Sequence, residues 1–321
     1  MKRLLVASML VGAGLGVSNA SAQDWPSKAI KLVVPYAPGG YTDAVGRITA
    51  RFLEKELAQT VVVDNRPGGG GIVGSDLVSK SPGDGYTLCV CSAGAISIAP
   101  VAQTTSYDPL KSFKTISVVS TIPQTVIVNN TLPINSMEDL VKYAKANPGK
   151  LTYGSSGAGG LMYYSVALFD SRVGTKMIHV PYKGGAPATM AVVAGEVNLS
   201  FTNMTDALPQ MEAKTVRALA VTSAKRSEFA PNLPTVAETV VPNYAVESWN
   251  GIMAPASTPD AIVSKVSDAL KKMAADPEVK KQMAVVGAST VFTTPAEFST
   301  QIGKEVEQWR DLLKEIGEKK T

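Results

Sequence analysis

Short β-branched runs alternate with longer stretches of helical periodicity along this 321-residue chain, and this alternation limits the fold more than any other feature. After the first such run, Val45, Ile48, Phe52 and Leu57 recur at the spacing of one helix face. Such alternation is typical of parallel βαβ units and predicts an α/β fold. The first set comprises strands at residues 30–34, 61–64 and 86–91, with helices at 42–57 and 72–80. A second set comprises strands at 125–129, 151–154, 177–180, 199–202 and 216–221, with helices near 161–173, 187–194 and 206–213.

The C-terminal region predicts how the two sets are joined. Residues 223–242 are Pro-rich and irregular, and the following residues return to helices at 259–275, 277–286 and 295–316, with short strands at 248–253 and 290–292. A block of helices with too few strands for its own sheet must pack on an earlier sheet. We therefore expect a discontinuous first domain, residues 23–121 plus 223–321, with residues 122–222 inserted as a second domain. Two chain crossings between the domains then form a hinge.

The N-terminus has the pattern of a secretory signal peptide. Lys2 and Arg3 precede an apolar run at residues 4–17, and Ala20-Ser21-Ala22 fits the site that signal peptidase cleaves. The run is shorter than the ~20 apolar residues that a spanning helix needs. We expect residues 1–22 to be removed after Ala22 and the mature protein to reach the periplasm.

Charge and composition exclude several classes of function. Two of the 31 basic residues lie in the signal peptide, which leaves 29 against 27 acidic residues. This balance is too near neutral for a nucleic-acid-binding surface. His179 is the only histidine, and with two cysteines the chain has too few ligands for the usual Cys/His zinc site. We expect no nucleic-acid partner, no metal site and no cofactor.

The two cysteines, Cys89 and Cys91, lie in one predicted strand and point to the same face. A disulfide across a single intervening residue would distort the strand. A redox or metal role is typical of C-x-x-C spacing or a histidine partner, and neither is present. We expect two reduced cysteines that act as small core hydrophobes.

Two glycine motifs leave enzymatic alternatives open. Residues 69–74 fit G-x-G-x-x-G, but Asn65-Arg66-Pro67 separates them from the preceding strand, unlike a dinucleotide site. Residues 154–158 resemble the G-x-S-x-G nucleophile elbow except at Ala158, and a catalytic triad would have to recruit His179 from an apolar strand. A glycine turn and a strand histidine are the simpler interpretations. A secreted hydrolase or a nucleotide-dependent enzyme remains the alternative.

Gly/Ser/Thr turns follow several predicted strands, and each opens a helix. Exposed N–H groups at a helix start carry partial positive charge and bind anions. Ligands of open α/β sheets bind at the carboxyl ends of the strands. Two such sets in two hinged domains predict a cleft for an anionic small molecule. The turns lie at residues 38–42, 92–94, 155–159, 184–185 and 203–205.

Ordered motifs across the mature chain closely resemble the tripartite tricarboxylate transporter substrate-binding family, the Bug-type receptors. The resemblance covers nearly the whole mature chain, which makes it more specific than any single motif. The motifs are VVPYAPGGYTD at 33–43, VVVDNRPGGGG at 61–71, DGYTL at 84–88, YDPLKSF at 107–113, VPYKGGAPA at 180–188, RALAVTSAKR at 217–226, LPTVAE at 233–238 and APASTP at 254–259.

The resemblance implies a two-domain periplasmic-binding-protein fold of the type II-like, Venus flytrap kind. It implies a non-enzymatic, monomeric receptor that delivers a small carboxylate to the membrane subunits of a tripartite tricarboxylate transporter. One ligand carboxylate is then held by the first glycine loop and the rest of the ligand by the second-domain loop, with Lys183 in a matching loop. The implied ligand-binding residues are Pro38, Gly39, Gly40, Tyr41, Thr42, Ser92, Ser155, Ser156, Gly157, Gly159, Tyr163 and Asn203.

Three departures from the family pattern shape the expected ligand. Tyr41 stands where a small residue is common, Tyr163 replaces a common histidine, and Thr202 stands where aspartate is frequent. Loss of an aspartate removes a partner for an amino group, which disfavours an amino-acid ligand. Tyrosines add flat apolar surface. We hypothesise a dicarboxylate with an apolar spacer, including aromatic diacids such as terephthalate. The alternative is that both tyrosines are packing residues.

Overall fold

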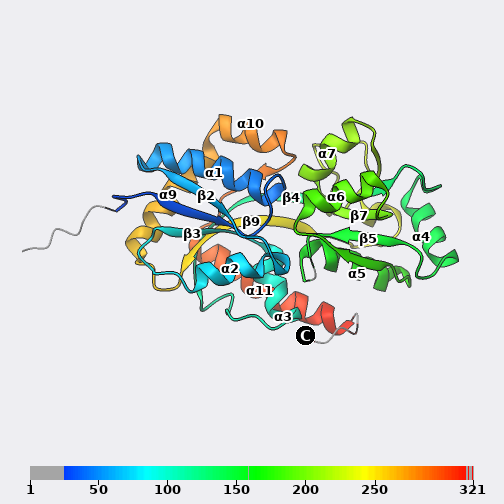
Figure 1. Cartoon of the computed structure of the whole chain (residues 1–321), viewed down its shortest axis with the longest axis horizontal. Helices are drawn as coiled ribbons and strands as arrows, with labels where there is room; N and C mark the ends of the chain where they lie inside the picture. The colour runs from blue at the N-terminus through cyan, green and yellow to red at the C-terminus, as the bar shows by residue number, and fades with distance from the viewer. Residues whose placement is uncertain (1–24, 158, 316, 318–319, 321) are drawn as a thin grey trace, which may run out of the picture.

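The computed structural model describes residues 25–157, 159–315, 317 and 320. The predicted signal peptide and its cleavage after Ala22 lie outside these residues. Within them, no helix combines the length and apolar character that a membrane span requires. Two lobes lie side by side, each built from strands with helices on both faces (Figure 1).

The first lobe contains the N-terminal βαβ units and the C-terminal helices. Three N-terminal strands are parallel to one another, and β9 pairs antiparallel with β3. Helices α1, α9 and α10 cover one face, while α2, α3 and α11 cover the other (Figure 1). The strands are β1 (Ile30–Val34), β2 (Val61–Asn65), β3 (Thr87–Ser92), β9 (Glu247–Pro255) and β10 (Ser289–Thr290). The helices are α1 (Tyr41–Leu57), η1 (Gly69–Gly71), α2 (Ile72–Ser79), η2 (Gly94–Ile98), α3 (Ala99–Ala102), α9 (Asp260–Ala275), α10 (Pro277–Val285) and α11 (Pro295–Glu315).

Successive side chains of each strand point to opposite faces of the sheet, so apolar residues form a core on both faces of the first-lobe sheet. Leu32 and Leu88 pack with the apolar face of α1, including Val45 and Ile48 as expected from their spacing. Val33, one position along β1, packs on the opposite face in the cluster that contains α11. The first sheet is therefore buried between two helical layers.

The second lobe contains the inserted strands and their helices. Strand β5 is parallel to both β6 and β7, whereas β4 runs antiparallel to β7 and β8. Helices α6 and α7 lie over one face and α5 over the other, with α4 farther from the first lobe (Figure 1). The strands are β4 (Phe113–Asn129), β5 (Thr152–Ser155), β6 (Ile178–Pro181), β7 (Leu199–Asn203) and β8 (Val216–Val221). The helices are α4 (Met137–Ala146), α5 (Leu161–Val173), α6 (Gly185–Ala194), α7 (Met204–Glu212) and α8 (Val236–Thr239).

Strand β4 belongs to both lobes. Residues 113–123 pair with β9, whereas residues 124–129 pair with β7 and β8. The sheet therefore runs without a break in the order β2-β1-β3-β9-β4-β7-β5-β6. The Thr222 hydroxyl accepts a hydrogen bond from Gln124 N at 2.9 Å and donates to Val246 O at 2.6 Å. The buried Thr222 side chain thus joins β4, the segment after β8 and the segment before β9 where the lobes meet.

The structure matches most predicted elements and corrects one strand. β1, β8 and α5 have the predicted bounds, but the strand predicted at 125–129 is only the second half of β4. The first half includes Lys114, Ser117 and Ser120, which interrupt the apolar pattern, and it pairs with β9 from the far end of the sequence. The domain division at residues 122 and 223 stays a prediction, because β4 runs continuously through the first of these boundaries.

The expectation of two reduced cysteines is wrong. Cys89 and Cys91 form a disulfide within β3, and both are fully buried. Residues two apart in a strand share a face, and the Cα atoms here are 5.3 Å apart. That separation lies within the usual disulfide range of about 4.4–6.8 Å. A regular strand would separate these Cα atoms by about 6.6 Å, so β3 is contracted locally where the disulfide forms.

Replacement of Thr222 by valine should lower the free energy of unfolding by about 1–3 kcal/mol. The substitution keeps the side-chain shape but leaves Gln124 N and Val246 O, both buried, without this partner. Urea unfolding followed by circular dichroism measures the change. Thr222→Ser, which keeps the hydroxyl, is the matched control and should retain most of the stability. Equal stabilities for both variants would contradict a role for the hydroxyl.

Candidate functional site

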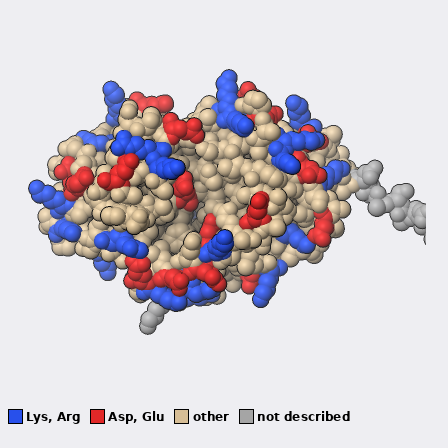
Figure 2. Space-filling view, turned by 180° about the vertical axis from the view of Figure 1, so that it is seen from behind, with Lys and Arg blue, Asp and Glu red and all other residues tan. Residues whose placement is uncertain are grey.

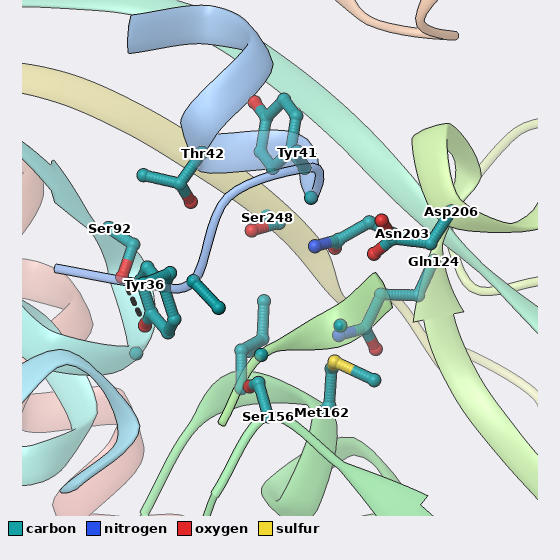
Figure 3. A pocket seen from close by; sticks show the side chains of 16 residues that line it. Tyr36, Tyr41, Thr42, Ser92, Gln124, Ser156, Met162, Asn203, Asp206 and Ser248 are labelled. Carbon is teal, nitrogen blue, oxygen red and sulfur yellow. Dashed lines mark hydrogen bonds between the residues drawn. The ribbon is translucent and has the colours of Figure 1, made fainter. Parts of the chain in front are cut away.

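A polar pocket lies between the lobes, where the strands of both end (Figure 3). It encloses about 460 Å³ of space not filled by protein atoms, part of which is open to solvent. Lysine and arginine are absent from the described residues that line it. The lining residues are Tyr36, Ala37, Gly40, Tyr41, Thr42, Ser92, Gly94, Gln124, Ser156, Leu161, Met162, Gly184, Gly185, Asn203, Asp206 and Ser248.

Four helices begin at this pocket. The N-cap residues of α1, α5, α6 and α7 are Gly40, Gly160, Gly184 and Asn203, and none makes a side-chain capping hydrogen bond. The first N–H groups of a helix have no partner within the helix and carry partial positive charge. The four helix starts come from both lobes. Their arrangement creates a positive environment for an anion without a charged side chain.

The loop before α1 is shaped by glycine and an internal ion pair. Gly39 has a φ of +95°, a left-handed conformation that favours glycine. Its N–H donates to Asp43 Oδ2 at 3.0 Å, and Arg47 Nε donates to the same oxygen at 2.9 Å. Burial by itself would raise the pKa of Asp43, but hydrogen bonds from Arg47, Gly39 N and Asn65 lower it. The Asp43 carboxylate is therefore occupied in holding the loop.

Glycine also permits close contact between the lobes. A methyl group added at Gly94, after β3, would lie 2.9 Å from Leu161 N at the start of α5. One added at Gly157, in the second lobe, would lie 3.0 Å from Gly70 N in the first. Ala37 N in the first lobe donates to Lys183 O in the second at 3.4 Å. These contacts set the two lobes directly against each other around the pocket.

Tyrosine hydroxyls form part of the first-lobe wall. Tyr36 Oη donates to Gly70 O at 2.7 Å and lies 2.8 Å from Ser92 Oγ (Figure 3). Burial raises the pKa of Tyr36 to about 12, so its hydroxyl stays neutral. Tyr41 Oη lies 2.8 Å from Ser120 Oγ. Both phenols are therefore fixed by the protein.

Several buried polar atoms at the pocket have no hydrogen-bond partner among the described residues. They are both polar side-chain atoms of Gln124, Oδ1 of Asn203 and Oδ1 of Asp206. A buried polar group without a partner destabilises a protein by about 1–3 kcal/mol. The three side chains lie close together on the second-lobe side (Figure 3). They are available to a polar ligand.

Asp206, in the first turn of α7, is the acidic residue of the pocket lining. Its side chain is buried, and burial raises the pKa of its carboxyl to about 7. Thr202 Oγ1 donates to Asp206 Oδ2 at 3.4 Å, and Thr189 Oγ1 lies 2.8 Å from the Thr202 hydroxyl. Thr202 stands where family members often have aspartate, and in this chain Asp206 brings a carboxyl to the pocket one helical turn later.

Half of the predicted ligand-binding residues line the pocket. These are Gly40, Tyr41, Thr42, Ser92, Ser156 and Asn203. Pro38 and Gly39 are exposed in the loop before α1. Ser155, Gly157, Gly159 and Tyr163 lie beside the pocket without lining it, and Tyr163 stacks with Tyr153 and contacts His179 edge-on. Whether the six lining residues bind a ligand stays a prediction.

Of the described residues in the motifs behind the enzymatic alternatives, only Ser156, at the nucleophile position of residues 154–158, lines the pocket. Ser155 Oγ is 2.6 Å from His179 Nε2, but Ser155 is fully buried. Burial lowers the pKa of His179. The glycines at residues 69–71 form a three-residue turn before α2. The described hydrogen bond of His179 goes to Ser155, the neighbour of the motif serine, and not to Ser156 at the pocket.

Sequence reasoning missed ten lining residues, for identifiable reasons. Gln124 and Ser248 come from β4 and β9, the strands at the lobe boundary, and no turn motif marks them. Asp206 could have been found from its place one turn after the predicted Asn203 loop. Three more, Gly94, Gly184 and Gly185, lie within predicted turns but were not named as ligand-binding residues. The others, Tyr36, Ala37, Leu161 and Met162, lie near those turns.

Two α/β lobes joined by a shared strand, with a polar pocket between their strand ends, define the fold of the periplasmic solute-binding proteins. The sequence pattern described as "Tripartite tricarboxylate transporter family receptor" matches residues 45–318. The chain therefore belongs to the tripartite tricarboxylate transporter receptor family, whose members are periplasmic binding proteins.

Individual relatives agree with this assignment. The chain is 32% identical to protein BugT of Bordetella pertussis over 325 residues, which covers 99% of each chain. The structure of R. palustris Rpa4515 with adipate has a TM-score of 0.90 at 33% identity, covering 93% of this chain and 100% of that one. MatC (Rpa3494) from Rhodopseudomonas palustris with bound malate has a TM-score of 0.86 at 26% identity, covering 90% and 100%.

Replacement of Gln124 by methionine should raise the free energy of unfolding of the ligand-free protein by about 1–3 kcal/mol, because both polar side-chain atoms are buried without a partner. The same change should weaken binding of a carboxylate ligand. Urea unfolding and calorimetry measure the two effects. Gln308→Met, at an exposed position on α11, is the control and should change stability by less than about 0.5 kcal/mol. A destabilised Gln124 variant would contradict the assignment of this side chain to ligand binding.

Proposed function

We propose that this chain captures a small dicarboxylate between its lobes and delivers it to the membrane subunits of a tripartite tricarboxylate transporter. The observation that carries the proposal is the convergence of four uncapped helix N-termini on one pocket without a lining lysine or arginine. Helix starts in opposite lobes hold separated carboxylates. Each hydrogen bond to a charged group contributes about 1.5–3 kcal/mol net.

The ligands of two solved relatives support a diacid. Adipate is bound in one and malate in the other, and both are small molecules with two carboxylates. Leu161 and Met162 offer apolar surface for a spacer between the acidic groups. Of the two tyrosines considered for an aromatic ligand, Tyr41 lines the pocket and Tyr163 does not. This distribution favours an aliphatic spacer over a ring such as that of terephthalate.

Closure of the lobes is part of the proposed mechanism. Residues 23–121 with 223–321 act as one domain and residues 122–222 as the other, and they rotate about the crossings near Gln124 and Thr222. Closure removes water from the pocket and so strengthens each electrostatic contact. We further propose that the signal peptide is cleaved after Ala22, that the receptor acts in the periplasm as a monomer, and that it catalyses no reaction.

A thermal-shift panel should separate this proposal from the enzymatic alternatives. A diacid at about 100 times its dissociation constant stabilises the protein by roughly 2.7 kcal/mol and raises the melting temperature. Succinate, malate, adipate and terephthalate form the test set, and NAD and a p-nitrophenyl ester are the controls. Stabilisation by NAD, or hydrolysis of the ester, would contradict the proposal, as would indifference to every diacid.

Replacement of Ser156 by alanine should weaken diacid binding about tenfold or more, because its hydroxyl lies at the pocket in the second-lobe loop. Calorimetric titration with the best diacid of the panel measures the change. Ser299→Ala, on α11 and outside the pocket, is the matched control and should bind as the parent does. Equal affinities for the two variants would remove Ser156 from the site.

A further inference from the structure

A carboxyl group in a pocket for anions needs an explanation. Asp206 is 7% exposed, and its Oδ1 has no partner among the described residues. This oxygen faces the first turn of α1 across the pocket, since a methyl group added at Gly40 would lie 3.6 Å from it. The other oxygen, Oδ2, accepts from Thr202 Oγ1. The unpartnered oxygen therefore points to the helix start at which we expect one ligand carboxylate.

No neighbouring element supplies a cation to Asp206 among the described residues. Of the elements packed on α7, α6 and β7 contain no titratable side chain, and Lys114 of β4 pairs with Asp260 at the far end of that strand. The other titratable or charged groups on nearby segments are engaged or exposed. The hydroxyl of Tyr41 hydrogen-bonds with Ser120, and Asp43 pairs with Arg47. Arg217 of β8 donates to the carbonyls of Leu132 and Ile134. Lys183, Glu212 and Glu247 are exposed.

We propose that Asp206 binds the ligand in its protonated form and donates its Oδ1 hydrogen to a ligand carboxylate, so that the receptor takes up a dicarboxylate dianion together with one proton. The inference rests on the proposed function, because the ligand is taken to be a diacid. The Thr202 hydroxyl donates to Oδ2 and so leaves Oδ1 as the oxygen that carries the hydrogen. An O–H to carboxylate hydrogen bond is among the stronger kinds.

Charge balance favours the protonated form. An ionised Asp206 would place a third negative charge beside a bound dianion in a pocket without a cation, and like charges at short range disfavour ionisation. Burial has already raised the pKa of this carboxyl to about 7 in the free protein, and a dianion raises it further. Affinity is then greatest below pH 7, where the group is already protonated. It falls by up to tenfold per pH unit above pH 7, because binding must take up a proton.

A different ligand class would use the same residue in the opposite way. A ligand ammonium would pair with ionised Asp206, and binding would then release a proton from the carboxyl. Affinity would rise with pH up to about 7 and then level off. Amino diacids would bind better than the corresponding plain diacids.

The experiment is calorimetric titration of the full mature chain with adipate, succinate and L-aspartate between pH 6 and pH 9. Each titration is made in two buffers that differ in ionisation enthalpy, so that proton uptake is measured directly. We expect uptake of close to one proton per adipate at pH 8.5 and little uptake at pH 6. The dissociation constant for adipate should rise at least tenfold between pH 7 and pH 9.

Asp206→Asn tests the residue, since asparagine keeps the shape and a donor but cannot titrate. This variant should bind adipate within about threefold of the parent at pH 6, with no proton uptake and no dependence on pH. Glu247→Gln, beside the pocket residue Ser248, is the matched control and should keep the parental pH dependence. Asp206→Ala should bind weakly at every pH. Circular dichroism checks that each variant folds.

The outcomes distinguish the role of Asp206 from the proposed diacid-binding function. Adipate binding that is independent of pH in the parent, or a pH dependence that survives in Asp206→Asn, would overturn the role of Asp206 and leave the diacid receptor standing. Preference for L-aspartate over succinate, with loss of binding in Asp206→Asn, would assign the residue to an ammonium instead. Failure of the parent to bind any plain or amino diacid would overturn the proposed function as well.

Discussion

The site depends on backbone amides at helix starts that are left without a capping side chain. In α1, α5 and α6 the N-cap residue is glycine, which has no side chain with which to satisfy these groups. Because the helices follow strands of both lobes, the amides meet between the lobes. The fold therefore supplies the positive field, and the sequence needs to supply only small residues at the right positions. Apart from Asp43 and Asp206, which are buried, charged side chains lie mainly on the outer surface, where both signs are intermixed on the face seen in Figure 2.

The sequence predicts the local parts of this structure well and the long-range parts poorly. Strand and helix periodicity placed β1, β8 and α5 at their observed bounds, and the turn motifs located Gly40, Ser92, Ser156 and Asn203 at the pocket. Gln124 and Ser248 could not be found in this way. They reach the pocket because β4 and β9 pair across more than a hundred residues of sequence. The Cys89–Cys91 disulfide was missed because a regular strand separates alternate Cα atoms by about 6.6 Å, and the sequence does not reveal the local contraction to 5.3 Å.

Polar atoms without partners among the described residues cluster at the pocket, although single ones also occur elsewhere in the interior, at Thr49, Ser75 and Thr258 among others. Elsewhere, buried hydroxyls such as those of Thr222 and Thr189 have partners within the protein. At the pocket, Gln124, Asn203 and Asp206 keep acceptor or donor atoms unused. These groups lower the stability of the empty protein, and a ligand that pairs with them recovers that stability. Under the proposed function, the same atoms would contribute both to binding and to closure of the lobes.

The continuity of β4 limits how the lobes can move. A hydrogen-bonded strand twists and bends, but it neither stretches nor lets the two halves of the sheet slide past each other. Thr222, which follows β8 where the chain leaves the second lobe, hydrogen-bonds with Gln124 of β4 and with Val246 at the boundary between the lobes. For the closure proposed above, the motion that remains is rotation about a single axis beside Gln124. The separation of the two opposing amide clusters is then a function of one angle, so under the proposed function the length of a diacid would set a degree of opening that a membrane partner could recognise.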